Sequence, residues 1–356
     1  MRLDAKNTLP ADGTIGALAA RAWRPDVDGP SIVALRGQDV IDITRVFPTM
    51  RDLCETPDPA TALQLARGER LGSITELLDN TPPDARNPTR PWLLAPIDLQ
   101  VIKAAGVTFA ISMLERVIEE RARGNPAAAA AIREEIVSLV GDDLSKLKPG
   151  SPQAMALKEV LIAQGAWSQY LEVGIGPDAE IFTKTPVLGA VGHGERIGIR
   201  RDSVWNNPEP EVVLAVAADG RIRGAALGND VNLRDFEGRS ALLLPEAKDN
   251  NASCAIGPFI RLFDAGYSAD DVRRADLALR VDGPDGFVLE GPRSMARTSR
   301  HPVDLAAQAI GVGKRGRIRL GGKVDRLAFT PPSNFLRGGG VVKGPHSFAL
   351  NIRPVA

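Results

Sequence analysis

The chain is poor in cysteine, histidine and aromatic residues, and neither sign of charge is in excess. Its 356 residues include two cysteines and three histidines, aromatic residues make up 4%, and 44 basic side chains balance 44 acidic ones. Cys54 and Cys254 lie far apart, which excludes a disulfide framework and a cysteine zinc cluster. No segment approaches the roughly 18 to 20 apolar residues of a membrane helix, and the first residues show no signal-peptide pattern. We therefore expect a cytoplasmic protein with no membrane partner.

Charge is nevertheless distributed unevenly along the chain. Residues 311–356 carry nine basic side chains and one acidic side chain, a net charge of +8. A basic terminus is typical of an arm that binds nucleic acid. This one lacks the interleaved aromatic pattern of such arms, so we expect no nucleic-acid partner.

The chain divides into a small β-rich domain at residues 1–79, a proline-rich linker at 80–95 and a larger domain at 96–356, whose last part, 311–356, is a divergent terminus. Apolar spacing predicts helices at 110–120, 127–140 and 152–170. β-prone runs then predict strands at 180–183, 196–199, 211–217, 222–227, 277–281 and 287–289. Helices that are separated from a long run of strands indicate an α+β, mostly β fold.

Three carboxylates are expected to meet at the open end of one hairpin. Asp219-Gly220 separates two β-prone runs, as in a two-residue turn. That turn would place Glu209 opposite Asp230 and put Glu211 on the same face as Glu209. Three neighbouring anions repel one another unless a cation binds, and Mg²⁺ accepts such oxygen ligands. The alternative is a solvated strand end at which the acids point apart.

Five sequence motifs lie on and around the expected hairpin, at residues 183–186, 191–195, 202–211, 228–235 and 244–248. In their order and spacing they resemble the fumarylacetoacetate hydrolase superfamily. Within it, the chain most resembles the 2-keto-3-deoxy-sugar-acid dehydratases, of the ketodeoxyarabonate or ketodeoxypentonate type. The hydrolases often carry a His and Glu pair in a lid helix, whereas residues 105–116 here contain Glu115 and no histidine.

The resemblance implies a β-roll catalytic domain of the fumarylacetoacetate hydrolase type, preceded by a small β-rich N-terminal domain. It also implies a Mg²⁺ ion, with Mn²⁺ or Ca²⁺ as alternatives, held by Glu209, Glu211 and Asp230. The substrate would be a 2-keto acid that chelates the metal, and polarisation of its ketone would acidify the C3 hydrogen. A homodimer or homotetramer is expected.

The resemblance also implies roles for four further side chains. We expect Lys248 to act on the C3 proton or the enolate and Glu115 on the departing C4 hydroxyl, with the two roles exchangeable. Lys184 and Ser112 are expected to bind the substrate, with Lys184 facing its carboxylate. A pentonate substrate would give 2,5-dioxopentanoate.

Three functions remain open from the sequence. The first is the Mg²⁺-dependent dehydratase. The second is a carbon–carbon hydrolase of the acylpyruvate or fumarylpyruvate type, which would share the metal site. The third is a non-catalytic protein: an inactive homologue, because the family's closing Thr-Gly-Thr type loop is absent near Gly313, or a nucleic-acid binder acting through the basic terminus.

Overall fold

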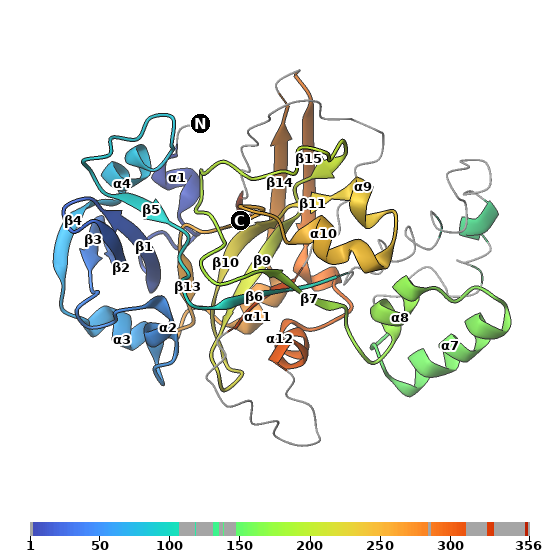
Figure 1. Ribbon diagram of the computed structural model, residues 1–356. Helices are drawn as coiled ribbons and strands as arrows, with labels where there is room; N and C mark the ends of the chain where they lie inside the picture. Colours follow the sequence, from blue (N-terminus) through green and yellow to red (C-terminus); the bar gives the residue numbers. More distant parts are fainter. Residues whose placement is uncertain are drawn as a thin grey trace.

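The protein has an α+β, mostly β fold built on one large sheet (Figure 1). The computed structural model describes residues 3–106, 118, 131–134, 138, 147–283, 286–310, 326–330 and 353–354. The sheet has 12 strands, ten of which run in the order β4-β3-β2-β1-β13-β10-β9-β16-β6-β7, while β12 pairs with β10 and β5 pairs with β1. In this part of the chain, no helix has the length and apolar character needed to cross a membrane.

The first 80 residues form one end of this sheet, drawn in blue and cyan in Figure 1. Gly37, with a φ of +58°, lies in the two-residue loop between β2 and β3. Ser73 caps α4 and exchanges hydrogen bonds with Glu76 in a capping box. The elements are α1 (Ala5–Thr8), β1 (Leu18–Arg24), β2 (Gly29–Arg36), β3 (Asp39–Asp42), α2 (Met50–Cys54), α3 (Pro59–Leu65), β4 (Glu69–Ser73) and α4 (Ile74–Asn80).

The residues expected to form a linker are folded against this module. The Asn80 side-chain amide donates to the carbonyl oxygens of Asn87, Arg90 and Pro91, which organises the proline-rich loop. The loop leads into β5 (Trp92–Leu94), which pairs with β1, and then into β6 (Val101–Ala105). The domain boundaries stay a prediction.

The helix expected at 152–170 is two helices. α7 (Pro152–Ala163) begins at the Ser151 cap with proline in its first turn. It stops before Gly165, whose φ of +64° is a conformation that favours glycine, and α8 (Gln169–Ile175) follows from a new cap at Ser168. The helices expected at 110–120 and 127–140 lie almost wholly outside the described residues.

The central hairpin consists of β9 (Pro210–Val216) and β10 (Ile222–Asp230). Its turn differs from the expected two-residue loop: Ala217 accepts from Gly220 and donates to Arg221, so the loop has three residues, with Gly220 at a φ of +88°. A bulge at Arg223 then inserts one extra residue. The two irregularities compensate, and from Gly224 onward the strands pair as the sequence predicts.

The remaining elements surround this hairpin. No strand forms at 196–199, where one was expected, and the sequence did not predict β13 or β16, which flank the hairpin in the sheet. The remaining elements of the described residues are β7 (Ile181–Thr185), β8 (Asn206–Asn207), β11 (Asn232–Leu233), α9 (Arg234–Glu237), η2 (Ala241–Leu243), α10 (Leu244–Lys248), β12 (Cys254–Ile256), β13 (Ile260–Leu262), α11 (Ala269–Arg274), β14 (Asp276–Asp282), β15 (Val288–Ser294), η3 (Met295–Arg297), α12 (Pro302–Ile310), β16 (Arg326–Thr330) and β17 (Arg353–Pro354).

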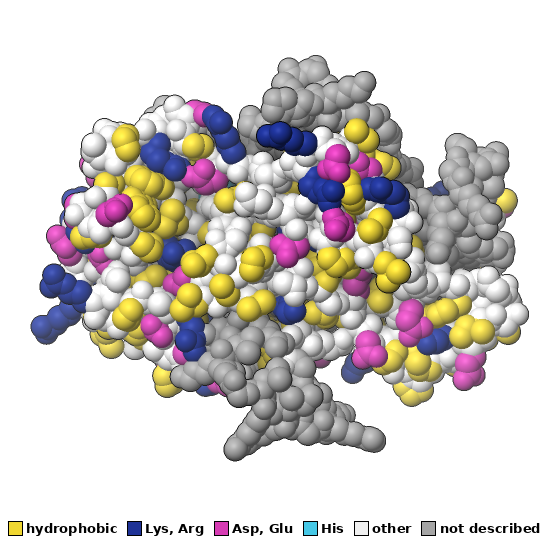
Figure 2. Space-filling model, viewed as in Figure 1, with side chains coloured by type: hydrophobic (Ala, Val, Ile, Leu, Met, Phe, Trp, Pro, Cys, Tyr) yellow, Lys and Arg dark blue, Asp and Glu magenta, His cyan; other side chains and the backbone are white. Residues whose placement is uncertain are grey.

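The part of the basic terminus that is described belongs to the sheets. β16 lies between β6 and β9, parallel to the first and antiparallel to the second, and β17 pairs with β14. On the face shown in Figure 2, acidic and basic side chains are interspersed, in keeping with the balanced charge of the whole chain.

Hydrophobic packing on both faces of the sheet holds β9 rigidly. All seven residues of β9 are buried. Val213 and Ala215 belong to a core shared with the N-terminal module, whereas Val212, Leu214 and Val216 pack against the side that carries α11 and α12. A strand buried on both faces keeps its backbone in place, which is what a site of fixed geometry needs.

Candidate metal centre

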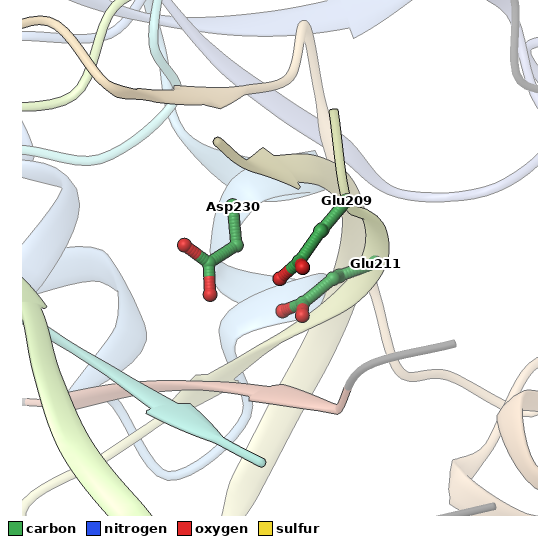
Figure 3. Close-up of side chains that lie close together, drawn as sticks. All are labelled: Glu209, Glu211 and Asp230. Atoms are coloured by element: carbon green, nitrogen blue, oxygen red, sulfur yellow. The ribbon is translucent and has the colours of Figure 1, made fainter. Parts of the chain in front are cut away.

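Three carboxylates converge where the central hairpin opens (Figure 3). Glu209 directly precedes β9, Glu211 is the second residue of β9, and Asp230 ends β10. The Asp230 amide donates to the Glu209 carbonyl oxygen at 2.8 Å, and Glu211 pairs with Gly228. One oxygen from each carboxylate lies within 4.8 Å of the others. The structure therefore brings together the three acids that the hairpin register predicts.

The cluster is buried, unlike a solvated strand end. Glu211 and Asp230 are each 1% exposed, and the Glu209 side chain is 17% exposed. Among the described residues, Glu211 Oε2 has no hydrogen-bond partner. An ionised oxygen in that state costs several kcal/mol, of the order found for buried charges that lack a partner.

Two buried lysines accompany the acids. The Lys248 ammonium, at the end of α10, contacts Glu209 Oε2 and lies 3.1 Å from Asp230 Oδ2. The Lys184 ammonium, on β7, lies 2.8 Å from Asp230 Oδ1 and donates to the carbonyl oxygens of Val231 and Lys248. With all three carboxylates ionised, three negative and two positive charges give the centre a formal net charge of −1.

Burial and mutual repulsion shift the acids towards their protonated forms. Burial, reinforced by the charge of Asp230, raises the pKa of Glu211 well above its usual value. Burial also raises the pKa of Glu209, although Lys248 opposes the shift. For Lys248, burial alone would lower the pKa, but Asp230 and Glu209 outweigh it and hold the pKa well above its usual value.

The donor set fits a hard divalent cation. Three carboxylate oxygens at this spacing, one of them buried without a partner, match the oxygen ligands that Mg²⁺ and Ca²⁺ take. The cluster contains no sulfur or imidazole ligand, which softer metals prefer. Added positive charge would also reduce the repulsion that raises the carboxyl pKa values.

Sequence reasoning missed the neighbours of Glu209. The side-chain amides of Asn207 and Asn232 donate to Glu209 Oε1 at 3.3 and 3.0 Å. The Asn229 side chain accepts from the Glu209 backbone amide at 3.0 Å. The sequence did carry a signal for these hydrogen bonds, because asparagines lie next to the acids on both strands, at residues 206–209 and 229–232.

The other predicted site residues fall into two groups. Lys184 is fully buried and its ammonium faces protein atoms, an arrangement that favours positioning Asp230 over contacting the substrate carboxylate. Glu115 and Ser112 lie outside the described residues. Their roles, and that of Lys248, stay predictions.

Sequence comparison finds similarity to sugar-acid dehydratases over one third of the chain. No family model matches the chain. It is 43% identical over 115 residues to 2-dehydro-3-deoxy-D-arabinonate dehydratase of Saccharolobus solfataricus, a match that covers 32% of this chain and 37% of that protein. It is 41% identical over 120 residues to a probable 2-keto-3-deoxyxylonate dehydratase of Haloferax volcanii, covering 34% of this chain and 40% of that protein. The match thus spans about two fifths of each relative's length.

Structure comparison extends the similarity to nearly the whole chain. The apo form of 2-keto-3-deoxy-D-arabinonate dehydratase superposes with a TM-score of 0.60 at 20% identity, covering 95% of this chain and 98% of that one. The same enzyme complexed with magnesium and 2,5-dioxopentanoate superposes with a TM-score of 0.58 at 19% identity, over the same shares.

These comparisons confirm the resemblance that the motifs indicate. The protein has the fold of the fumarylacetoacetate hydrolase superfamily, with a carboxylate centre that can hold a metal. More particularly, the relatives with which it shares sequence are 2-keto-3-deoxy-sugar-acid dehydratases.

Proposed function

We propose that the protein is a Mg²⁺-dependent dehydratase of a 2-keto-3-deoxy sugar acid, with a pentonate as substrate and 2,5-dioxopentanoate as product. The observation that carries the proposal is the buried centre of three carboxylates and two lysines. With its acids ionised, as metal binding requires, the centre has a formal net charge of −1, which one divalent cation changes to +1. A 2-keto acid carries one negative charge, so its carboxylate would neutralise the loaded site. The named relatives and the magnesium-bound neighbour support the same reading.

Different residues of the chain would serve different steps of the substrate's dehydration. Glu209, Glu211 and Asp230 would hold Mg²⁺, which supplies Lewis acidity to a chelated ketone. The Lys248 ammonium contacts Glu209 and lies 3.1 Å from Asp230, so it lies beside the position of the chelated ketone. It would act on the C3 proton or on the negative charge of the enolate. Glu115 would act on the departing C4 hydroxyl, and the two roles are exchangeable.

We also propose that the enzyme is a cytoplasmic homodimer or homotetramer that binds a small 2-keto acid and neither a nucleic acid nor a membrane. The oligomeric state and the 2-keto acid rest on the family resemblance. The location and the excluded partners rest on the sequence patterns described above.

Product analysis tests the proposed reaction. Purified protein is incubated with Mg²⁺ and a panel of 2-keto-3-deoxypentonates, and the aldehyde product is trapped and identified. We expect 2,5-dioxopentanoate from at least one stereoisomer, loss of the product with EDTA, and recovery with added Mg²⁺. Glu211→Gln serves as the matched inactive control. Cleavage of an acylpyruvate with no aldehyde from any pentonate would refute the dehydratase and favour the hydrolase.

A further inference from the structure

Two asparagines from paired strands bind one oxygen of a metal-site carboxylate. Asn207 on β8 and Asn232 on β11 are partners in a two-stranded sheet. Both side chains are buried, at 6% and 0% exposure. Their amide nitrogens lie 3.3 and 3.0 Å from the same atom, Glu209 Oε1. Glu209 Oε1 therefore accepts two hydrogen bonds before any metal binds.

The orientation of the Asn232 amide follows from the charges around it. Its nitrogen also donates to Glu237 Oε2 at 2.6 Å, and the same Glu237 oxygen accepts from Arg234 at 3.0 Å. The reverse orientation would place the amide oxygen against two carboxylates, which repel it. The Asn232 side chain is thus held as a donor to both.

The opposite oxygen of Glu209 is the one that faces the centre. Lys248 contacts Glu209 Oε2 and also reaches Asp230 Oδ2 at 3.1 Å. Oε2 is therefore on the Asp230 side, and Oε1 is on the side of the two amides. Glu209 can offer one oxygen to a cation without breaking the amide hydrogen bonds.

One available oxygen distinguishes between hard cations. Mg²⁺ demands octahedral geometry at about 2.0 to 2.1 Å and binds carboxylates through single oxygens, whereas Ca²⁺ takes 6–8 ligands and accepts both oxygens of a carboxylate. We propose that Asn207 and Asn232 are positioning residues that restrict Glu209 to one ligand atom and thereby favour Mg²⁺ over Ca²⁺. This inference rests on the metal site of the proposed function and deepens it.

Calorimetric titration of the purified full chain with Mg²⁺ and, separately, with Ca²⁺ tests the inference without substrate. The variants are Asn232→Leu and Asn207→Leu, which keep side-chain size and remove the donors. Loss of an outer hydrogen-bond partner typically costs 10- to 100-fold in metal affinity. We expect about a tenfold weaker Mg²⁺ affinity with little change for Ca²⁺, so the preference for Mg²⁺ falls about tenfold.

Asn80→Leu is the matched control. Asn80 is equally buried, at 4% exposure, and its amide donates to three carbonyl oxygens in the N-terminal module. Its loss should lower stability and leave the Mg²⁺ to Ca²⁺ affinity ratio unchanged. Circular dichroism establishes which variants fold. If Asn232→Leu does not fold, the affinity ratio is measured on Asn207→Leu, which removes the longer hydrogen bond.

An unchanged ratio of Mg²⁺ to Ca²⁺ affinity in a folded variant would overturn the inference. This includes losses of equal size for both cations, which indicate a merely structural role. The result is separable from the dehydratase proposal. Selective Mg²⁺ binding that depends on the asparagines, without turnover of any pentonate, would retain the inference and refute the proposed reaction. Turnover of a pentonate together with an unchanged affinity ratio in the variants would retain the proposed reaction and refute the inference.

Discussion

Replacing Glu211 by glutamine should stabilise the metal-free protein and abolish cation binding. The side chain keeps its shape and loses its charge. In the structure Glu211 is 1% exposed, its Oε2 has no partner among the described residues, and Asp230 adds repulsion. Removing a carboxyl from such surroundings removes an unfavourable contribution to folding, which is the opposite of what most core substitutions do.

Proton uptake sets an upper limit on the gain. A buried carboxyl can become neutral by binding a proton. The free energy of that protonation depends on how far the pH lies above the unfolded pKa of 4.5. At pH 7 that limit is about 3.4 kcal/mol, and at pH 5 it is about 0.7 kcal/mol. The buried amide of glutamine needs hydrogen-bond partners of its own, and their lack reduces the gain in stability by about 1 kcal/mol or more. We therefore expect a net stabilisation of about 1–2 kcal/mol at pH 7 and none at pH 5.

The sign follows from proton linkage. The folded-state pKa of Glu211 lies above its unfolded value, so the folded state binds more protons and stability falls as pH rises from 4.5 towards the folded pKa. Urea titrations of the EDTA-treated wild type and Glu211→Gln at pH 5 and pH 7 measure the difference. Mg²⁺ should then raise the melting temperature of the wild type alone. Equal Mg²⁺ binding by the two proteins, or a variant less stable at pH 7, would refute the reasoning.

Three further predictions concern other charged groups. Lys248→Met should abolish turnover and tighten Mg²⁺ binding by about tenfold or more, because a buried positive charge next to the carboxylates repels the cation; weaker binding by calorimetry would contradict this. Burial lowers the pKa of His193 to about 4, so the folded state excludes a proton and loses about 1.5 kcal/mol as pH falls from 6.5 to 5, a loss that urea titration should not find in His193→Gln. The buried Arg300 donates to four backbone carbonyl oxygens within residues 173–178, at the end of α8 and just beyond it, so Arg300→Met should cost about 3 kcal/mol in a urea titration, whereas the same change at exposed Arg196 should cost under about 0.5 kcal/mol.

The pairing of the central hairpin could be predicted although its turn was wrong. The sequence suggested a two-residue turn at Asp219-Gly220, whereas the structure has a three-residue loop and a bulge at Arg223. The pairing near the site is nevertheless the expected one. Both faces of β9 are apolar beyond Glu211, so the carboxylate is the residue that a wrong register would misplace. A slip by one residue would turn Glu211 towards the apolar core that carries α11 and α12. The cost of burying a carboxylate there constrains the register more strongly than the turn type does.

Sequence alone determined which residues could form the centre. The alternation of side chains along two adjacent strands is local, so it placed Glu209, Glu211 and Asp230 together without knowledge of the rest of the chain. The motifs around them indicated the superfamily, whose fold the structural comparison confirms.

Tertiary structure decided how those residues are surrounded. Lys184 arrives from β7 and Lys248 from α10, and only the packing of these elements around the hairpin shows that both ammonium groups face Asp230. The amides on Glu209 depend in the same way on the pairing of β8 with β11. Hydrogen bonds and charges between distant segments have no periodic signal in a sequence, because they depend on long-range packing and burial rather than on local spacing.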